Sequence, residues 1–234
     1  MSKPFNPHDF YFKKAKETGF RARSVFKLEE IQKRFKLLRP GQCVLDLGCS
    51  PGSFMQYAAN IVGKSGLLLG FDIKPVTNLG DDRIKTFVAS VLEDEIYTII
   101  ERELPRVDVI ISDIAPNTSG IKDVDHGRSI ILNEAICQIA AKFLVPHGNM
   151  LLKVFDGGYF PGFVQEVKKS FKQVKVVKPD ASRDRSREVY VVALDKKPSI
   201  GTGPVLIAMS PLIPVSRNAG GFLGRGCLWH VSLV

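Results

Sequence analysis

Hydrophobic residues follow two alternating patterns along most of this chain. Short runs of consecutive apolar residues, such as "LLLGFDI" at 67–73, alternate with longer segments whose apolar residues recur every three or four positions. Consecutive apolar residues are typical of strands that are covered on both faces in a parallel sheet. The runs predict strands at 43–47, 67–73, 85–91, 107–113, 149–155, 173–178 and 188–194, and the spaced segments predict helices at 19–37, 53–62, 93–103, 128–145 and 160–171.

The order of these elements predicts the fold class. Strands alternate with helices through most of the chain, which is the arrangement of a doubly wound α/β sheet. The last two strands are joined only by the short link "PDASRDRS", so we expect an antiparallel hairpin at the sheet edge. The sequence therefore predicts an α/β fold with a seven-stranded, mostly parallel sheet and an antiparallel edge strand.

Charge is divided unevenly along the chain, whose formal net charge is +9. Residues 1–40 hold 11 Lys or Arg against 4 Asp or Glu, and residues 168–197 hold 10 against 4. Residues 41–167, between them, hold 10 against 16. An acidic body with two basic flanks favours a polyanionic partner, for which nucleic acid is the usual candidate. The alternative is that the flanks are solvated, lysine-rich helix faces.

Length and composition suit one domain with two appendages. We divide the 234 residues into a basic N-terminal helical segment at 1–40 packed on the core, a core domain at 41–197 and a tail at 198–234. The tail has no Asp or Glu, six glycines and four prolines, and we expect it to be poorly ordered. No apolar run approaches the ~20 residues that span a bilayer, so no membrane partner is expected.

Cysteine and histidine positions show no metal-ligand spacing, so we expect no bound metal. The N-terminus also lacks the apolar core of a signal peptide. We therefore expect a cytoplasmic protein, as a monomer, in a reducing compartment that keeps its cysteines as free thiols. These cysteines are Cys43, Cys49, Cys137 and Cys227.

A glycine-containing turn follows the first expected strand, in "VLDLGCSPGSF" at 44–54. Gly48 and Gly52 let the backbone turn tightly and approach a ligand without a Cβ in the way. Alone, this turn is weak evidence, because it is not G-x-G-x-x-G and many strand–helix turns contain glycine. Asp72, at the end of the second strand, could accept hydrogen bonds from both ribose hydroxyls of an adenosine, or could serve as a turn or cap residue.

Asp46 indicates which cofactor the turn suits. A carboxylate close to a helix N-terminus disfavours a phosphate and favours a cationic group, such as the amino-acid part of S-adenosylmethionine. A dinucleotide would instead place its pyrophosphate there. The sequence therefore favours S-adenosylmethionine over NAD as the cofactor.

Four charged residues far apart in the chain stand in phrases that suggest chemistry. Lys27 lies in "RARSVFKL", Asp113 in "IISDIAPNTSG", Lys153 in "MLLKVFDGG" and Glu188 in "SREVYVV". Asp113 follows a strand at the sheet edge where ligands bind in such folds, and Lys153 interrupts an apolar strand although lysine is seldom buried without a partner or a task. Two lysines and two carboxylates beside a nucleotide pocket suggest activation of a weakly acidic hydroxyl. The alternative, two surface ion pairs, fits Lys27 and Glu188 better than Lys153.

From about Phe10 to Lys197 the chain resembles the FtsJ/RrmJ family of RNA 2′-O-ribose methyltransferases. The resemblance is carried by "RSVFKLEEIQ", "VLDLGCSPGSFMQY", "SDIAPNTSG", "LLKVF" and "VKPDASRDRSREVYVVA". It implies a Rossmann-like class I methyltransferase domain at 41–197 that binds S-adenosylmethionine. The phrases are most similar to the bacterial branch, whose members act on a uridine of 23S ribosomal RNA in the assembled large subunit.

The resemblance also implies roles for single residues. The family's catalytic Lys-Asp-Lys-Glu tetrad falls on Lys27, Asp113, Lys153 and Glu188. The positions that would bind the cofactor are Asp46, Gly48, Ser50, Pro51, Gly52, Phe54, Asp72, Ser90 and Asp113.

Two positions depart from the family pattern. Phe54 stands where the family often has tryptophan, and it should still pack the pocket. Ser90 stands where an adenine-contacting acid is expected, so Glu93 or Asp94 is the alternative contact. The tail beyond Lys197 also lies outside the family pattern.

Lys153 is the candidate for contact with the ribose 2′-oxygen. A ribose hydroxyl is a very weak acid, so its reaction needs a base or strong electrostatic help. Either a neutral Lys153 accepts the proton, or a protonated Lys153 orients the oxygen and stabilises the developing alkoxide. The sequence leaves both mechanisms open, with Asp113 positioning Lys153 and with Lys27 and Glu188 completing the network.

The basic flanks are the expected RNA-binding surface, because arginine and lysine suit phosphate. The candidates are Lys13, Lys14, Lys16, Arg21, Arg23, Arg183, Arg185 and Arg187. Other functions stay open: methylation of another RNA such as tRNA or an mRNA cap, or RNA binding as a non-catalytic ribosome-assembly factor. A small-molecule methyltransferase would not need the charge division, and a dehydrogenase fits Asp46 poorly.

Overall fold

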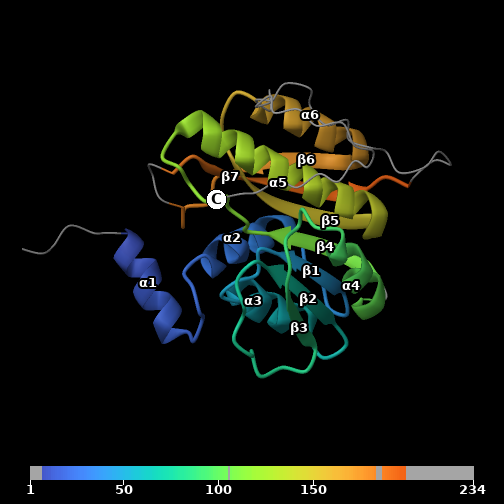
Figure 1. The fold of residues 1–234 in the computed structure, drawn as a ribbon. Coiled ribbons are helices and arrows are strands. Elements are labelled where there is room, and N and C mark those ends of the chain that lie inside the picture. Colours follow the sequence, from blue (N-terminus) through green and yellow to red (C-terminus); the bar gives the residue numbers. More distant parts are fainter. Residues whose placement is uncertain (1–6, 105, 183–185, 199–234) are drawn as a thin grey trace, which may run out of the picture.

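A seven-stranded sheet forms the centre of the described part of the chain, residues 7–104, 106–182 and 186–198 in a computed structural model (Figure 1). The strand order is β3-β2-β1-β4-β5-β7-β6. Strands β1 to β5 pair in parallel, and β7 is antiparallel to both of its neighbours. The strands are β1 (Cys43–Leu47), β2 (Leu67–Asp72), β3 (Ile84–Val88), β4 (Val107–Ser112), β5 (Leu144–Phe155), β6 (Phe171–Val177) and β7 (Glu188–Lys196).

This topology confirms the predicted α/β fold with an antiparallel hairpin at one edge. The reversed strand itself, β7, lies between β5 and the edge strand β6. The strand order reverses direction between β1 and β4, and such a switch point is where ligands bind at the carboxyl ends of the strands.

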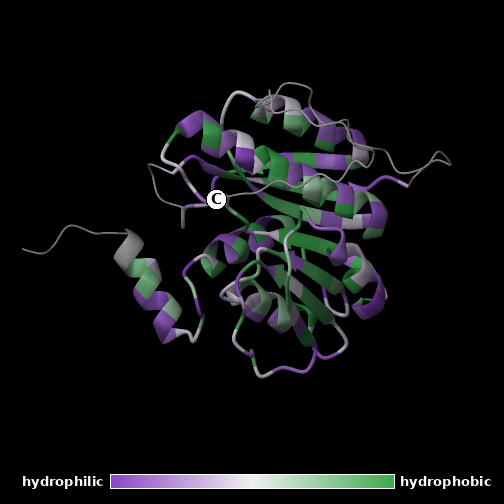
Figure 2. Ribbon diagram, in the orientation of Figure 1, coloured by the Kyte–Doolittle hydropathy of each residue, from purple (hydrophilic) through white to green (hydrophobic). Residues whose placement is uncertain are grey.

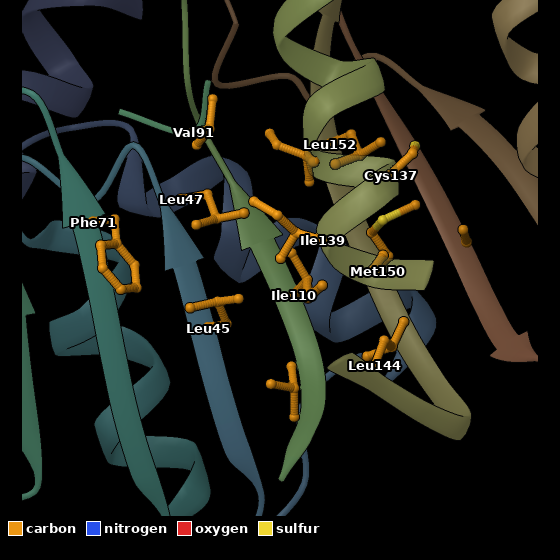
Figure 3. Close-up of a cluster of buried hydrophobic side chains, with 14 of the residues drawn as sticks. Leu45, Leu47, Phe71, Val91, Ile110, Cys137, Ile139, Leu144, Met150 and Leu152 are labelled. Carbon is orange, nitrogen blue, oxygen red and sulfur yellow. The ribbon is translucent and has the colours of Figure 1, made fainter. Parts of the chain in front are cut away.

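Helices cover both faces of the sheet. In the described part they are α2 (Val25–Phe35), α3 (Ser53–Val62), α4 (Glu95–Glu103), α5 (Lys122–Phe143) and α6 (Phe160–Ser170). Helix α1 (Pro7–Glu17) lies away from the sheet and packs against the start of α2 (Figure 1). Alternate side chains of each strand point to opposite faces. One set, including Val44, Ile111 and Leu151, packs with α2 and α3, and the other packs with α4, α5 and α6. Figure 3 shows residues of the second set, with Leu45, Ile110 and Met150 on the adjacent strands β1, β4 and β5.

Hydropathy follows these layers. Figure 2 shows hydrophobic residues along the central strands and hydrophilic residues on the outer sides of the helices. The strands β1 and β4 are buried at every position, which explains why apolar residues stand on both faces of each strand. Asp46 and Asp108 are the buried charged residues within them.

The N-terminal region differs from the prediction of one helix at 19–37. Helix α1 ends at Glu17, Gly19 has a φ of 76°, and α2 begins only at Val25. Phe20 fits a helical spacing in the sequence, but it packs from the connecting loop against the rings of Phe26 and Tyr57. Phe20 therefore keeps the spacing of apolar positions that is typical of a helix although it belongs to a loop, and the prediction of one continuous helix was wrong for this reason.

Several other predictions have definite outcomes. Strand β5 begins earlier than expected, at Leu144, and α5 begins earlier, at Lys122. Three of the cysteines are free and buried, whereas Cys227 and the tail from residue 199 lie outside the described residues. In the described part, no helix is both long and apolar enough to cross a bilayer. The division into segments at residues 40 and 197 stays a prediction.

Candidate active site

Four charged residues from distant parts of the chain meet in one pocket. Lys27, Asp113, Lys153 and Glu188 line a cavity of about 460 Å³ together with Arg23, Ser24 and Ser186. The sequence singled out the first four as candidates, and the structure brings all four together. Ser24 and Ser186 were missed, since a serine next to a charged residue carries no distinctive signal.

Side-chain alternation explains why these residues converge. Lys153 follows Leu151 by two positions on β5, and Asp113 follows Ile111 by two positions at the end of β4, so both project toward the α2 face of the sheet. Glu188 begins β7, opposite Phe155 on β5. Lys27 lies on the buried side of α2, 6% exposed. The pocket therefore forms where three strand ends meet the first turn of α2.

The four residues form two ion pairs. The Nζ atom of Lys153 donates to the backbone oxygen of Asp113 at 2.5 Å and lies 3.1 Å from its Oδ1. The Nζ atom of Lys27 donates to Oε2 of Glu188 at 2.9 Å. Both lysines are buried, so these contacts are made with little competition from water. Each buried lysine thus has a carboxylate partner, as burial of an ionisable group requires.

Glu188 is the member of the tetrad whose acidity the pocket visibly changes. Burial raises the pKa of its carboxyl group, but the charges of Lys27 and Lys153 and hydrogen bonds from Lys27 and Ser186 outweigh burial and leave the pKa below its ordinary value. Glu188 is therefore held as a carboxylate at neutral pH.

Tyr190 completes the network, and sequence reasoning missed it. Its hydroxyl donates to Oδ1 of Asp113 at 2.5 Å, and its ring lies 5.6 Å from Nζ of Lys27. The side chain is fully buried, and burial together with the negative charge of Asp113 raises the pKa of the phenol well above its ordinary value. A signal was present, because Tyr190 follows Glu188 by two positions and so shares its face of β7.

The glycine turn after β1 is built for close approach of a ligand. Gly48 has a φ of 87°, and a Cβ there would lie 2.8 Å from the Cα of Ile114, so no larger residue fits. The turn is fixed by Asp72, whose Oδ2 accepts from the backbone N–H of Ser50 at 2.9 Å and whose Oδ1 accepts from that of Lys74 at 2.9 Å. Each carboxylate oxygen keeps a second lone pair for a ligand hydroxyl.

Asp46 is a buried carboxylate without a partner. It is 1% exposed, and neither of its oxygens has a hydrogen-bond partner among the described residues. Burial, followed by the charges of Asp113 and Asp72, raises its pKa well above the ordinary value. A cationic ligand group would supply the missing partner. The turn therefore fits the amino-acid part of S-adenosylmethionine, as the sequence predicted.

The other predicted cofactor residues differ in their surroundings. Phe54 is buried in α3, Pro51 is exposed in the glycine turn, and Ser90 follows β3. Ser90 is engaged locally: its Oγ accepts from the N–H of Leu92 at 3.2 Å, and its own N–H donates to Glu93 at 3.2 Å. An adenine contact by Ser90, Glu93 or Asp94 stays a prediction.

Residues 20–196 match the family model of FtsJ-like methyltransferases. This stretch contains both ion pairs and the glycine turn at 48–52, which we call the cofactor turn. The chain belongs to the FtsJ-like methyltransferase family. It is therefore an enzyme that transfers methyl groups.

Relatives of this FtsJ-like methyltransferase carry the name ribosomal RNA large subunit methyltransferase E. The one from Desulfatibacillum aliphaticivorans is 46% identical, over 81% of this chain and 91% of its own length. The one from Bdellovibrio bacteriovorus is 44% identical, over 82% and 99%. The fold is also that of a Plasmodium falciparum protein provisionally named a ribosomal RNA methyltransferase, with a TM-score of 0.67 and 24% identity over 76% of this chain and 98% of that one.

The basic residues predicted to bind RNA are placed unequally in this methyltransferase. Lys13 and Lys16 are exposed on α1, and Lys14 lies with its Nζ 4.5 Å from the ring centroid of Phe26. Arg23 lines the pocket, and Arg187 donates to the backbone oxygen of residue 156 at 2.6 Å. The remaining candidates of the second flank, Arg183 and Arg185, lie outside the described residues.

Arg21 has a second role that the sequence did not suggest. Its guanidinium donates to the backbone oxygens of Pro51 at 3.0 Å, Thr77 at 2.6 Å and Asn78 at 2.7 Å. Its backbone N–H donates to the side chain of Gln56 at 3.0 Å. Arg21 therefore ties the segment before α2 to the cofactor turn and to the loop after β2. Its predicted contact with RNA stays a prediction.

Proposed function

We propose that this methyltransferase uses S-adenosylmethionine to methylate the ribose 2′-oxygen of a uridine in 23S ribosomal RNA of the large ribosomal subunit. The observation that carries the proposal is the pair of buried lysines, each bonded to a carboxylate, in a pocket next to a turn that fits a cationic nucleoside ligand. The names of the relatives supply the substrate class.

The cofactor would be held by three features of the chain. Asp46 would pair with its ammonium group, Asp72 would accept from its ribose hydroxyls, and Gly48 leaves room for the backbone to approach. When bound, S-adenosylmethionine supplies a methyl group already activated by its sulfonium. The chain's own task is to align the acceptor oxygen and to manage one proton.

Lys153 is the residue that would contact the 2′-oxygen. Two of the positions around its Nζ are taken up by the backbone and side-chain oxygens of Asp113. If Lys153 is neutral, its lone pair accepts the hydroxyl proton as the oxygen–carbon bond forms. If it is an ammonium, its third N–H stabilises the developing alkoxide and the proton passes to solvent. A Lys153→Arg variant separates the two, because a guanidinium keeps its charge and can stabilise an alkoxide but cannot accept the proton, so retained transfer would favour the second mechanism.

Lys27 and Glu188 would hold the other side of the pocket. Their 2.9 Å ion pair links α2 to β7 and keeps a positive charge close to the position of the reacting nucleotide. Arg23 lines this pocket and Arg187 precedes Glu188 in the chain, and both charges would suit a phosphate backbone. We propose that the enzyme acts as a cytoplasmic monomer, since an assembled ribosomal subunit is its substrate.

The test is transfer of a tritiated methyl group from S-adenosylmethionine to large ribosomal subunits isolated from cells that lack this enzyme. We expect label in 23S RNA, and mapping of ribose methylation should locate it on one uridine. If tRNA or capped mRNA supplied in parallel is labelled and 23S RNA is not, that other RNA is the substrate. Bound cofactor without transfer to any RNA would favour a non-catalytic assembly factor.

A Lys153→Ala variant tests the site rather than the substrate. We expect methyl transfer to fall by about 100- to 10,000-fold, the usual contribution of a positioned proton-transfer group, while S-adenosylmethionine still binds. Turnover close to that of the unmodified enzyme would contradict both mechanisms for Lys153.

A further inference from the structure

The end of β5 extends beyond its neighbour β4. The last β4–β5 pair joins Ser112 to Leu152, whereas pairing with β7 continues to Phe155 and Glu188. Lys153 and Phe155 therefore lie past the end of β4 on one side while still paired to β7 on the other. Backbone groups that face the β4 side at these positions need other partners, because a buried unpaired peptide group is costly.

Helix α5 supplies these partners through three side chains. Nδ2 of Asn133 donates to the backbone oxygen of Lys153 at 3.0 Å. The N–H of Phe155 donates to Oγ of Ser129 at 3.1 Å, and the ring of His126 bonds to the backbone oxygen of Phe155 at 2.8 Å. The three are spaced by three and four residues, so they share one face of the helix.

His126 is fixed from a second side. Its Nε2 accepts from the backbone N–H of Tyr159 at 2.9 Å, so the neutral ring carries its hydrogen on Nδ1 and donates it to Phe155. The Tyr159 ring stacks on the imidazole at 5.6 Å between centroids. A Cβ at Gly157 would lie 2.6 Å from the imidazole, so the turn after β5 is packed directly on His126.

Packing alone does not account for these polar side chains. His126, Ser129 and Asn133 are at most 2% exposed, on a helix whose other buried positions after Asp125 are apolar. Burial of polar groups lowers stability unless they are hydrogen bonded, and Asn133 still leaves its Oδ1 without a partner among the described residues. An apolar α5 would cover the sheet but would leave the end of β5 unpaired.

We propose that His126, Ser129 and Asn133, the α5 ladder, are positioning residues that replace β4 as the partner of β5 and set the place of Lys153 relative to Asp113. The inference rests on the proposed role of Lys153 in methyl transfer. The gap that the ladder bridges is the gap between the ends of β4 and β5, and Asp113 and Lys153 face each other across it.

The test uses Ser129→Ala and Asn133→Leu, alone and combined. Leucine has the same number of side-chain heavy atoms and the same branching as asparagine and also removes the unpartnered Oδ1, so the fold should persist. We expect kcat of the double variant to fall by about 30-fold, since misplacing a reacting group by about 1 Å can cost ~100-fold. The Kd for S-adenosylmethionine and the KM for ribosomal subunits should stay unchanged.

Cys137→Ala is the matched control. Cys137 lies one turn beyond Asn133 on the same helix and is buried in the same core. Its truncation should lower Tm by leaving a cavity but should leave kcat unchanged. Crystal structures of the double variant and of the unmodified enzyme should show a longer distance from Nζ of Lys153 to the backbone oxygen of Asp113 in the variant.

Two results would overturn the ladder's role. One is an unchanged kcat in a folded double variant. The other is a double variant in which the distance from Nζ of Lys153 to the backbone oxygen of Asp113 equals that of the unmodified enzyme, and in which kcat and Tm change no more than in Cys137→Ala. Failure of the proposed function looks different, because the unmodified enzyme itself would then transfer no methyl group to ribosomal subunits.

Discussion

Asp46 is the residue whose chemistry most depends on a ligand. It is enclosed at the end of β1, its pKa is raised by burial and by Asp113 and Asp72, and neither oxygen is bonded among the described residues. An uncompensated buried carboxylate opposes folding as pH rises above its ordinary value of 3.8, because the folded state favours the protonated form. A cationic ligand would reverse this preference by pairing with the charged form.

Binding of S-adenosylmethionine should therefore release a proton from Asp46. We expect its affinity to rise as pH increases from 3.8 toward neutrality, and calorimetry in buffers of different ionisation enthalpy should count the proton. An Asp46→Asn variant should lose this pH dependence and about 10- to 100-fold of affinity, the contribution of a charged hydrogen bond.

Asp108→Asn is the matched control for Asp46. Asp108 is also buried, but it lies at the end of β4 that is remote from Asp113. There it accepts from the backbone N–H of Cys43 at 2.8 Å. Its replacement should leave the pH dependence of cofactor binding intact. Equal pH dependence in the Asp46→Asn variant and the unmodified protein would refute the assignment of Asp46.

At the scale of elements, two contacts join the N-terminal region to the sheet. The Lys27–Glu188 pair links α2 to β7, with side chains 8% and 25% exposed, and Arg21 links the loop before α2 to the cofactor turn. Both contacts begin next to the proposed RNA-facing surface and end at the active site. Loss of the Lys27–Glu188 pair should therefore lower stability as well as RNA binding, and loss of the Arg21 contacts should lower cofactor affinity as well as RNA binding.

The Lys27–Glu188 pair should stabilise the fold only above acid pH. The pKa of Glu188 in the folded protein lies below its ordinary value of 4.5, so the stabilisation is fully present above 4.5 and is lost as pH falls through the folded-state pKa. A Glu188→Gln variant should lower the free energy of unfolding by about 2 kcal/mol at neutral pH, and urea titrations should show that difference vanish in acid.

The Lys33–Glu29 pair provides the comparison on the same helix. Lys33 is 69% exposed, so Glu29→Gln should change the free energy of unfolding by at most about 0.5 kcal/mol. If the Glu188→Gln variant loses the same free energy of unfolding at low pH as at neutral pH, then packing of the side chain, and not the ion pair, causes the destabilisation.

Arg21 should support cofactor binding although it lies outside the pocket. Removing the guanidinium in Arg21→Ala frees the backbone oxygens of Pro51, Thr77 and Asn78, so we expect affinity for S-adenosylmethionine to fall by roughly 3- to 10-fold, as for about 1 kcal/mol of hydrogen bonding. Equilibrium dialysis without RNA measures this effect. Arg34→Ala, which removes an exposed arginine of α2, should leave the affinity unchanged.

At the scale of the whole molecule, charge and cofactor motifs occupy different parts of the chain. The cofactor turn and Asp72 belong to the acidic stretch 41–167, whereas Lys27 and Glu188 belong to the two basic flanks. The structure brings Lys27 and Glu188 within 2.9 Å of each other, so the proposed active site lies where the flanks meet the acidic body.

RNA affinity should consequently be strongly salt dependent. Phosphate binding releases counterions, so the logarithm of affinity should fall linearly with the logarithm of salt concentration, and each lost contact should reduce the slope by about one. Charge reversal of Lys13 and Lys16, both exposed on α1, should lower that slope in filter-binding measurements. Reversal of Lys64, exposed in the acidic body, should not, and a flat salt response of the unmodified protein would contradict RNA binding by the flanks.

Much of the fold could be predicted because its signals are local. Apolar residues on both faces marked β1 and β4 in spite of Asp46 and Asp108, and the glycine turn followed directly from its sequence. The break between α1 and α2 could not be predicted, since Phe20 keeps a helical spacing while it packs from a loop. The ladder of α5 was equally hidden, because its role arises only from where β4 ends.

Two buried lysines show the limit of sequence reasoning about the site. Lys153 lies in a buried strand and meets Asp113, whereas Lys196 is also buried but donates to the backbone oxygens of Ala140, Ala141 and Leu144 at the end of α5. The first arrangement suits chemistry and the second caps a helix. The sequence shows a lysine at an apolar position in both strands and does not reveal the partner.

By itself, the sequence determined the alternation of strands and helices, the position of the cofactor turn and the four charged candidates, because each depends on residues close together in the chain. Tertiary structure decided which candidates are paired, that Tyr190 joins them, that Arg21 clamps the cofactor turn and that α5 holds the end of β5. These contacts join residues between 20 and 161 positions apart. Strand order and strand length bring them together, and neither is written in any short stretch of the chain.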